Sequence, residues 1–226
     1  MSWMLLLLSN TALAAGGFSL PNPAEQIAQE GIRFSVRAVG ESWSGPHVTR
    51  VYRNSVVTGG GALLVPLSRG FVLDLEATYK RVGGHEINAE TEAKSGTASS
   101  FQLVPISAIL EGRVPLAGGG EVFAGVGAAF AVFREEHSLS SIQTTSTQGT
   151  KAGTDFRVGA RMETGLAMPS AAPVGRQLQS VEFEVFLGGR WHPRMMPKPV
   201  VVDGVKYRQG LNLSALRVGT GLAFRF

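Results

Sequence analysis

The chain has 226 residues, of which 44% are hydrophobic and 17% are charged, with 29 Gly and 11 Pro. So few charges are unlike a disordered tail or a coiled coil, and the lack of Cys excludes a disulfide scaffold, a thiolate metal site and a cysteine nucleophile. The net charge of +4 is too small an excess to imply nucleic-acid binding. No apolar run approaches the ~20 residues of a membrane helix, and the length suits one large domain or two small ones.

The first segment, residues 1–14, predicts an export signal. An apolar stretch (Trp3 to Leu8) is followed by Ala12-Leu13-Ala14, a small-residue cleavage site. No Lys or Arg precedes the apolar stretch, so the true start codon is expected upstream. A membrane-surface anchor or a buried helix is the alternative. Residues 15–30 are assigned to an N-terminal periplasmic segment, with a short helix or plug near its end.

Residues 31–226 predict strands, because apolar residues recur there with a period of two. Between Phe71 and Lys80 the odd positions are apolar and the even positions include Asp74 and Glu76. We expect a bulge or local widening at Pro105, which lacks a backbone donor, and close packing or a bend at Gly59-Gly60-Gly61. The eight predicted strands cover residues 32–41, 55–66, 71–80, 101–114, 122–134, 155–163, 181–192 and 216–226.

The connections between these strands alternate in length. Short turns are predicted around Ser68-Arg69-Gly70, over Pro115 to Gly120, and over about ten residues that include Pro169 and Pro173. The longer, more polar connections are residues 42–54, 84–99, 135–153 and 193–210, and the Ser/Thr-rich stretch 138–150 is expected to be a mobile loop. Short periplasmic turns with longer extracellular loops are typical of membrane barrels.

One face of the strands is apolar and the other carries nine positive and eight negative side chains. Small residues such as Gly159, Gly188, Gly219, Gly221 and Ala223 lie among them and leave room for long arginines in a narrow tube. We therefore predict that the charged face points inward as an ion-pair network and that the apolar face meets lipid. A solvated sheet is the alternative for any single strand. The predicted network comprises Arg33, Arg37, Glu41, Asp74, Glu76, Lys80, Glu111, Arg113, Asp155, Arg157, Arg161, Glu163, Glu182, Glu184, Arg190, Arg217 and Arg225.

Aromatic residues at the strand ends predict two interfacial belts, as lipid-facing girdles require. The turn-end belt comprises Phe71, Phe123, Phe183, Phe224 and Phe226, and the loop-end belt comprises Trp43, Tyr79, Phe101, Phe133, Phe156 and Trp191. Since backbone groups in lipid must be paired, we expect the first and last strands to close the sheet.

At this point residues 31–226 resemble the small eight-stranded outer-membrane barrels of the outer-membrane protein A transmembrane-domain or outer-membrane protein X kind. The likeness rests on strand number, the alternation of short turns and longer loops, the charged lumen and the terminal Gly-Leu-Ala-Phe-Arg-Phe. It implies an all-β, closed antiparallel eight-stranded up-and-down transmembrane β-barrel in the cell outer membrane. Phe224 and Phe226 are similar to the signal that the barrel-assembly machinery recognises. No peptidoglycan-binding domain follows the barrel, so we expect no cell-wall anchoring.

No catalytic or cofactor motif is found. There is no G-x-S-x-G elbow, and Gly59-Gly60-Gly61 lacks the Lys and Ser/Thr of a phosphate loop. The four histidines, expected near the loop end, lack metal-ligand spacing: His47, His85, His137 and His192. A metal site built from separate loops, or a rim enzyme using Ser42, His47 and His192, remains an alternative. We expect no enzyme activity, metal or cofactor.

The 193–210 connection predicts a protruding ribbon, because Asp203-Gly204 between β-branched residues is a hairpin signal. Its edge is a candidate surface for an external partner, and a merely ordered loop is the alternative. Its basic residues suit phosphates of lipopolysaccharide. The sequence thus predicts a monomeric, structural or surface-interacting outer-membrane barrel that binds no nucleic acid. The alternatives are a small gated pore, a rim lipid-modifying enzyme and a soluble ligand-binding barrel.

Overall fold

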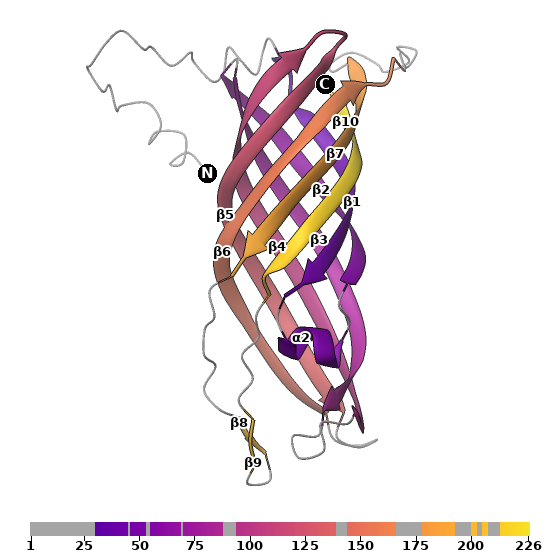
Figure 1. The fold of residues 1–226 in the computed structure, drawn as a ribbon, viewed down its shortest axis with the longest axis vertical. Coiled ribbons are helices and arrows are strands. Elements are labelled where there is room, and N and C mark those ends of the chain that lie inside the picture. The colour runs from indigo at the N-terminus through magenta and orange to yellow at the C-terminus, as the bar shows by residue number, and fades with distance from the viewer. Residues whose placement is uncertain are drawn as a thin grey trace, which may run out of the picture.

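A computed structural model describes residues 30–44, 46–52, 55–68, 70–87, 94–138, 144–165, 178–192, 200–202, 205–207 and 213–226. The predicted export signal and residues 15–29 lie outside the described residues. Eight long strands form a barrel, and a short helix and a hairpin lie at one end of it (Figure 1). The barrel strands are β1 (Arg33–Trp43), β2 (Ser55–Ser68), β3 (Phe71–Ile87), β4 (Lys94–Leu116), β5 (Gly120–Ser138), β6 (Thr144–Glu163), β7 (Ser180–Trp191) and β10 (Ala215–Arg225). The helix is α2 (Pro46–Val51), and the hairpin is β8 (Val200–Val202) with β9 (Val205–Tyr207).

The sheet closes completely. Its strand order is β1-β10-β7-β6-β5-β4-β3-β2, and all neighbours are antiparallel. The seam runs from Arg33 opposite Arg225 to Trp43 opposite Ala215. The predicted closed, eight-stranded, up-and-down barrel is therefore confirmed.

No helix among the described residues is long and apolar enough to cross a bilayer.

The two ends of the barrel differ. The turn end holds the turn at 117–119 and the C-terminus, whereas the loop end holds α2 and the β8–β9 hairpin (Figure 1). At the loop end β3, β4, β5 and β6 extend past their neighbours, since β2 pairs with β3 only as far as Tyr79 and β7 pairs with β6 only from Thr154. A four-stranded sheet thus projects beyond the closed part of the barrel.

Because of this extension, the connections predicted as loops at 84–99 and 135–153 are largely strand. β3 continues to Ile87 and β4 starts at Lys94, while β5 continues to Ser138 and β6 starts at Thr144. The Ser/Thr-rich stretch from 144 is strand, not loop. Thr is enriched in strands, but a strand that is polar on both faces shows no alternation of apolar and polar residues. The predicted contrast in connection length also fails at 164–179, which is longer than the connection at 139–143.

Pro105 does not cause a register shift. Pairing between β3 and β4 lapses between Ala77–Ile106 and Lys80–Leu103 and resumes in the same register. Of the two expected outcomes, the bulge is wrong, and the gap in the ladder is in line with local widening. The expected close packing in β2 is found at Gly60, where an added Cβ would overlap the backbone of Ala77 and the side chain of Thr78.

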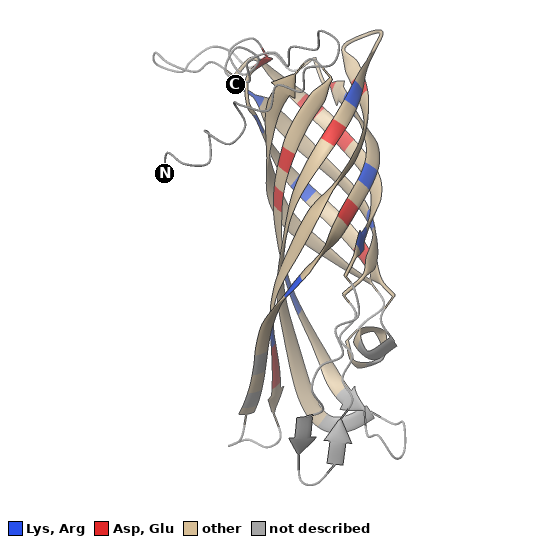
Figure 2. Ribbon diagram, turned by 90° about the vertical axis from the view of Figure 1, so that its left-hand side faces the viewer, with Lys and Arg blue, Asp and Glu red and all other residues tan. Residues whose placement is uncertain are grey.

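Side chains alternate between the bore and the exterior. In β1 and β10, Arg37 is 2% exposed and Arg217 is 1% exposed, whereas Val36 and Val218 are 53% and 60% exposed. Figure 2 shows charged residues distributed over the closed part of the barrel. The barrel is thus apolar outside and charged inside, the reverse of a soluble barrel.

Four residues predicted in the aromatic belts point inward instead. Trp43, Phe101 and Phe123 are almost fully buried, and Phe133 packs against the same interior cluster as Phe101. For Phe101, Phe123 and Phe133 the pattern did not reveal the face, because β4 and β5 are apolar on both faces near these positions. Trp43 has the parity of Glu41 in β1, a signal for its inward position that the belt prediction overlooked. The exposed aromatics of the predicted belts are Phe71, Tyr79, Phe156, Phe183, Trp191 and Phe226.

Candidate functional site

The middle of the bore is filled by a balanced ion-pair network of six cations and six carboxylates. All twelve side chains come from bore-facing positions of their strands and are almost completely buried. The cations are Arg37, Lys80, Arg157, Arg161, Arg190 and Arg217, and the carboxylates are Glu41, Asp74, Glu76, Glu111, Asp155 and Glu184. All twelve belong to the set predicted from the sequence.

Arg37 crosses the bore and connects three strands. Its Nε donates to Glu184 Oε1 at 2.6 Å, its Nη2 to Asp74 Oδ2 at 2.6 Å, and its Nη1 to Glu76 Oε2 at 2.9 Å. Glu184 lies 147 positions away in the sequence. This one guanidinium therefore ties β1 to both β3 and β7.

Arg157 and Arg161 of β6 complete the turn-side half of the network. Arg161 pairs with Glu111 at 2.7 Å and with Glu184 at 2.6 Å. Arg157 pairs with Asp74 and Glu76, each at 3.0 Å. Each carboxylate here meets more than one guanidinium, so the charges are neutralised as a group and not as isolated pairs.

The loop-side half of the network centres on Asp155 and Glu41. Arg217 pairs with Asp155 at 2.8 Å and with Glu41 at 3.2 Å. Arg190 pairs with the same two carboxylates at 2.9 and 3.3 Å. Lys80 pairs with Glu41, and Arg217 also pairs with Glu76.

Two aromatic rings lie inside the network, and the sequence analysis missed this role for both. The Arg161 guanidinium lies 3.9 Å from the centroid of the Phe123 ring, and Arg37, Arg157 and Arg217 lie within 6 Å of the centroid of Phe186. Such cation–π contacts suit desolvated guanidiniums. Phe186 lies two residues after Glu184 in β7, so the period of two already placed its side chain on the inward face.

The remaining five predicted network residues lie toward the turn end. Arg33 pairs with Glu121 at 2.7 Å and with Glu182 at 3.3 Å. The side chain of Glu163, the last residue of β6, is 44% exposed and 3.9 Å from Arg225, so it is a rim residue and not part of the buried network. Glu121 and Glu30, which both pair with Arg113, were missed. The five are Arg33, Arg113, Glu163, Glu182 and Arg225.

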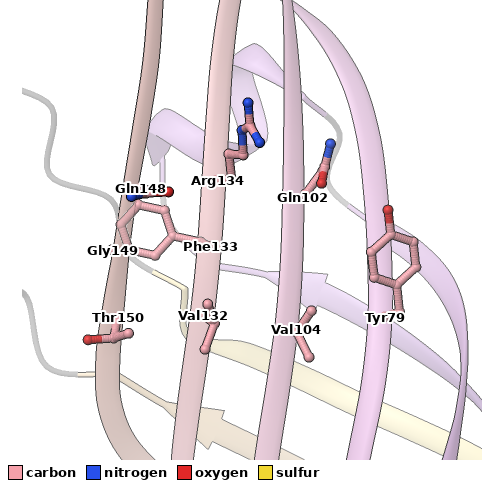
Figure 3. Close-up of a pocket in the computed structure, with 9 residues that line it drawn as sticks. All are labelled: Tyr79, Gln102, Val104, Val132, Phe133, Arg134, Gln148, Gly149 and Thr150. Carbon is pink, nitrogen blue, oxygen red and sulfur yellow. The ribbon is translucent and has the colours of Figure 1, made fainter.

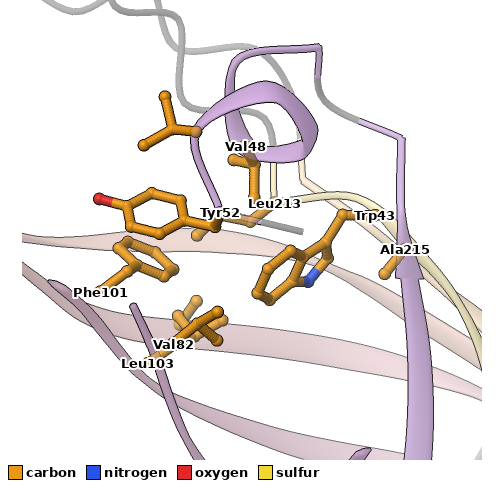
Figure 4. Close-up of a cluster of buried hydrophobic side chains, with 10 residues drawn as sticks. Trp43, Val48, Tyr52, Val82, Phe101, Leu103, Leu213 and Ala215 are labelled. Carbon is orange, nitrogen blue, oxygen red and sulfur yellow. The ribbon is translucent and has the colours of Figure 1, made fainter. Parts of the chain in front are cut away.

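An apolar cluster fills the bore on the loop side of the network. Val48 and Val51 of α2 pack with Tyr52 against the inward-facing Phe101 and Trp43 (Figure 4). The rings of Tyr52 and Phe101 lie 5.3 Å apart, centroid to centroid. The Tyr52 hydroxyl donates to Glu135 Oε1 at 2.5 Å. We call this cluster, with α2, the apolar plug; a short helix inside a polar loop gave no sequence signal for it.

The proposed rim residues are not brought together. Ser42 is exposed, His192 is buried, and the side chain of His47 lies outside the described residues. A different set is adjacent on the inner face of the projecting sheet: Ser99 Oγ lies 3.0 Å from His137 Nδ1, and His137 Nε2 lies 3.6 Å from Glu135 Oε2. Within the described ranges no group of His, Asp or Glu side chains has the arrangement of a metal site.

Comparisons with known proteins agree with the geometry. No protein-family model matches the sequence, and no curated protein matches it. The outer membrane protein OprG from Pseudomonas aeruginosa is similar in structure, with a TM-score of 0.51 at 9% identity, over 87% of this chain and 97% of that one. This chain has the fold of the small outer-membrane β-barrels.

Other outer-membrane barrels match less well. The N-terminal β-barrel domain of Pseudomonas aeruginosa OprF has a TM-score of 0.42 at 14% identity, over 86% of this chain and 97% of that one. Neisserial surface protein A has a TM-score of 0.44 at 10% identity, over 86% and 96%. The apolar exterior of an outer-membrane barrel needs acyl chains around it, and the protein therefore resides in the outer membrane.

Proposed function

We propose that this protein is a closed, non-conducting and non-catalytic barrel that acts through its outer surface. The observation that carries the proposal is the double filling of the bore, by the ion-pair network at mid-height and by the apolar plug at the loop end. Neither layer resembles the water-filled interior of a porin.

Opening such a bore would be costly. A water path through the middle would have to separate ion pairs that are shielded from solvent, and a buried charge that loses its partner costs several kcal/mol. It would also have to displace α2 from Phe101 and Trp43. A small gated pore, the alternative from the sequence, is thus disfavoured.

The loop end offers the surface for an interaction. Within the described chain, the β6 segment Thr144–Thr150 pairs with β5 alone, and a strand edge of this kind is a template for an added strand. The predicted hairpin is confirmed, with Val202 opposite Val205 across Asp203-Gly204. That it binds an external partner stays a proposal.

The apolar outer face of the barrel suggests its membrane partners. Outer-leaflet lipid, including lipopolysaccharide, would surround the apolar face of a monomer. Phe226 is 41% exposed at the end of the chain, next to the closing strand β10, which supports its role with Phe224 as a signal for the barrel-assembly machinery.

Planar-bilayer recording tests the proposal. We expect purified protein, with insertion verified by heat-modifiable migration of the recovered sample, to give no steady conductance steps. Glu76→Gln and Arg161→Gln, which unbalance the network, are expected to give brief openings at most. Steady wild-type conductance that changes in these two variants would overturn the proposal in favour of the pore.

A further inference from the structure

A groove of about 540 Å³ lies on the outer face of β3 to β6, toward the loop end (Figure 3). Two rows of outward-facing side chains border it. Val104 lies opposite Val132, and Val132 lies opposite Thr150. Two residues farther along the strands, Gln102 lies opposite Arg134 and Arg134 opposite Gln148. The groove therefore has one largely apolar border and one polar, positively charged border.

The rows beyond these borders show where the groove lies in the membrane. Toward the turn end the next outward row contains Ile106 and Phe130, which are 46% and 49% exposed. Toward the loop end the next row contains Ser100, Glu136 and Ser146. The outer face changes from apolar to polar at the groove, and this change marks the level of the lipid headgroups.

The groove lies between outward-facing side chains of four strands. The Phe133 ring points inward and lies over Gly149 on the inner side of the sheet, where an added Cβ would be 2.8 Å from the ring, so the ring underlies the groove and does not form its wall. Tyr79 closes the groove on the β3 side with its hydroxyl directed toward the polar border, as Figure 3 shows.

The charged group at the polar border is Arg134. Its side chain is 54% exposed and pairs with Glu136 at 2.7 Å, an exposed pair worth little by itself. A guanidinium matches the geometry of a phosphate with two parallel donors, and the amides of Gln102 and Gln148 supply further donors on either side. Arginine at a headgroup-level groove with an apolar border suits an anionic lipid.

We propose that this groove binds one phosphorylated acyl lipid of the outer leaflet. The phosphate contacts Arg134, and an acyl chain lies against Val104 and Val132. This inference rests on the placement of the barrel in the outer membrane and not on its closed bore.

Native mass spectrometry of the protein released from micelles with titrated diphosphoryl lipid A tests the assignment. We expect Arg134→Gln to weaken retention of the lipid about tenfold, the usual effect of losing a hydrogen bond to a charged group. The matched control is Arg81→Gln, which removes an exposed cation from the same row, opposite Gln102 but outside the groove. It should change retention less than twofold. Equal losses of lipid retention in the two variants would indicate general charge attraction and overturn the proposed site.

Two further arms test the ligand chemistry and the shape. Val104→Phe, which fills the apolar side, should weaken retention while leaving Arg134 intact. Lipid A without phosphates should bind wild type as weakly as diphosphoryl lipid A binds Arg134→Gln, and inorganic phosphate should not compete. Competition by inorganic phosphate, or equal retention of both lipids, would overturn the proposal. A barrel that is silent in bilayers and heat-modifiable would still support the proposed function.

Discussion

Arg37 illustrates how single side chains hold the bore together. It is 2% exposed and contacts three carboxylates from β3 and β7. A buried ion pair contributes little relative to a well-packed apolar replacement of both partners, but removal of one partner leaves uncompensated charge. The stability of this barrel should therefore depend on the balance of the network and not on the number of its pairs.

We expect Arg37→Met to lower the free energy of unfolding by about 3–5 kcal/mol, because Asp74, Glu76 and Glu184 lose a shared cation. Urea-induced unfolding in lipid vesicles measures this value. Arg134→Met, which breaks an exposed ion pair, is the control and should cost no more than about 1 kcal/mol. Similar values for the two variants would contradict the role given to the buried network.

At the scale of elements, α2 depends on its packing. It has six residues, and helices that short are not stable alone in water. Val48 and Val51 are 0% and 3% exposed, and Gly84 of β3 lies so close to the Val51 carbonyl that an added Cβ would overlap it. The interior of the barrel therefore makes this segment helical, and the helix in turn closes the loop end.

We expect Val48→Ala to accelerate tryptic cleavage within 44–54 about tenfold in vesicle-inserted protein. The substitution removes two buried methyl groups, which raises the fraction of molecules in which α2 is undocked from the barrel. Trypsin can then cleave after Arg50 and Arg53. Val57→Ala, at a position 77% exposed on the outer face of β2, is the control and should leave the rate unchanged. Equal rates in the two variants would show that α2 does not plug the bore.

At the scale of the whole molecule, the orientation of the two faces decides the environment. The outward row formed by Leu110, Val126 and Phe156 is apolar and 46–59% exposed, whereas arginines and carboxylates lie inside. Water would penalise this exposed apolar face, whereas acyl chains stabilise it. The closed part of the sheet also leaves no unpaired backbone edge in the lipid.

Val126→Arg is expected to lower the free energy of unfolding in vesicles by about 2–4 kcal/mol, the cost of a charge on the lipid face near the midplane. Ser146→Arg, on the projecting part of β6, should cost no more than about 1 kcal/mol. The same urea titrations measure both. A harmless Val126→Arg, in protein that stays in solution without detergent, would contradict the membrane orientation.

The eight strands, their two faces and the twelve charged residues of the central ion-pair network were determined by the sequence alone, because the period of two is a local pattern that most of the strands show. The Asp203-Gly204 hairpin was predictable for the same reason. Only the tertiary structure decided the inward position of Phe101 and Phe123, the extension of β3 to β6 and the docking of α2. It also decided which charges pair, as in Arg217 with Glu41, 176 positions apart. These features depend on register and closure, which bring distant residues together and leave no mark on the local pattern.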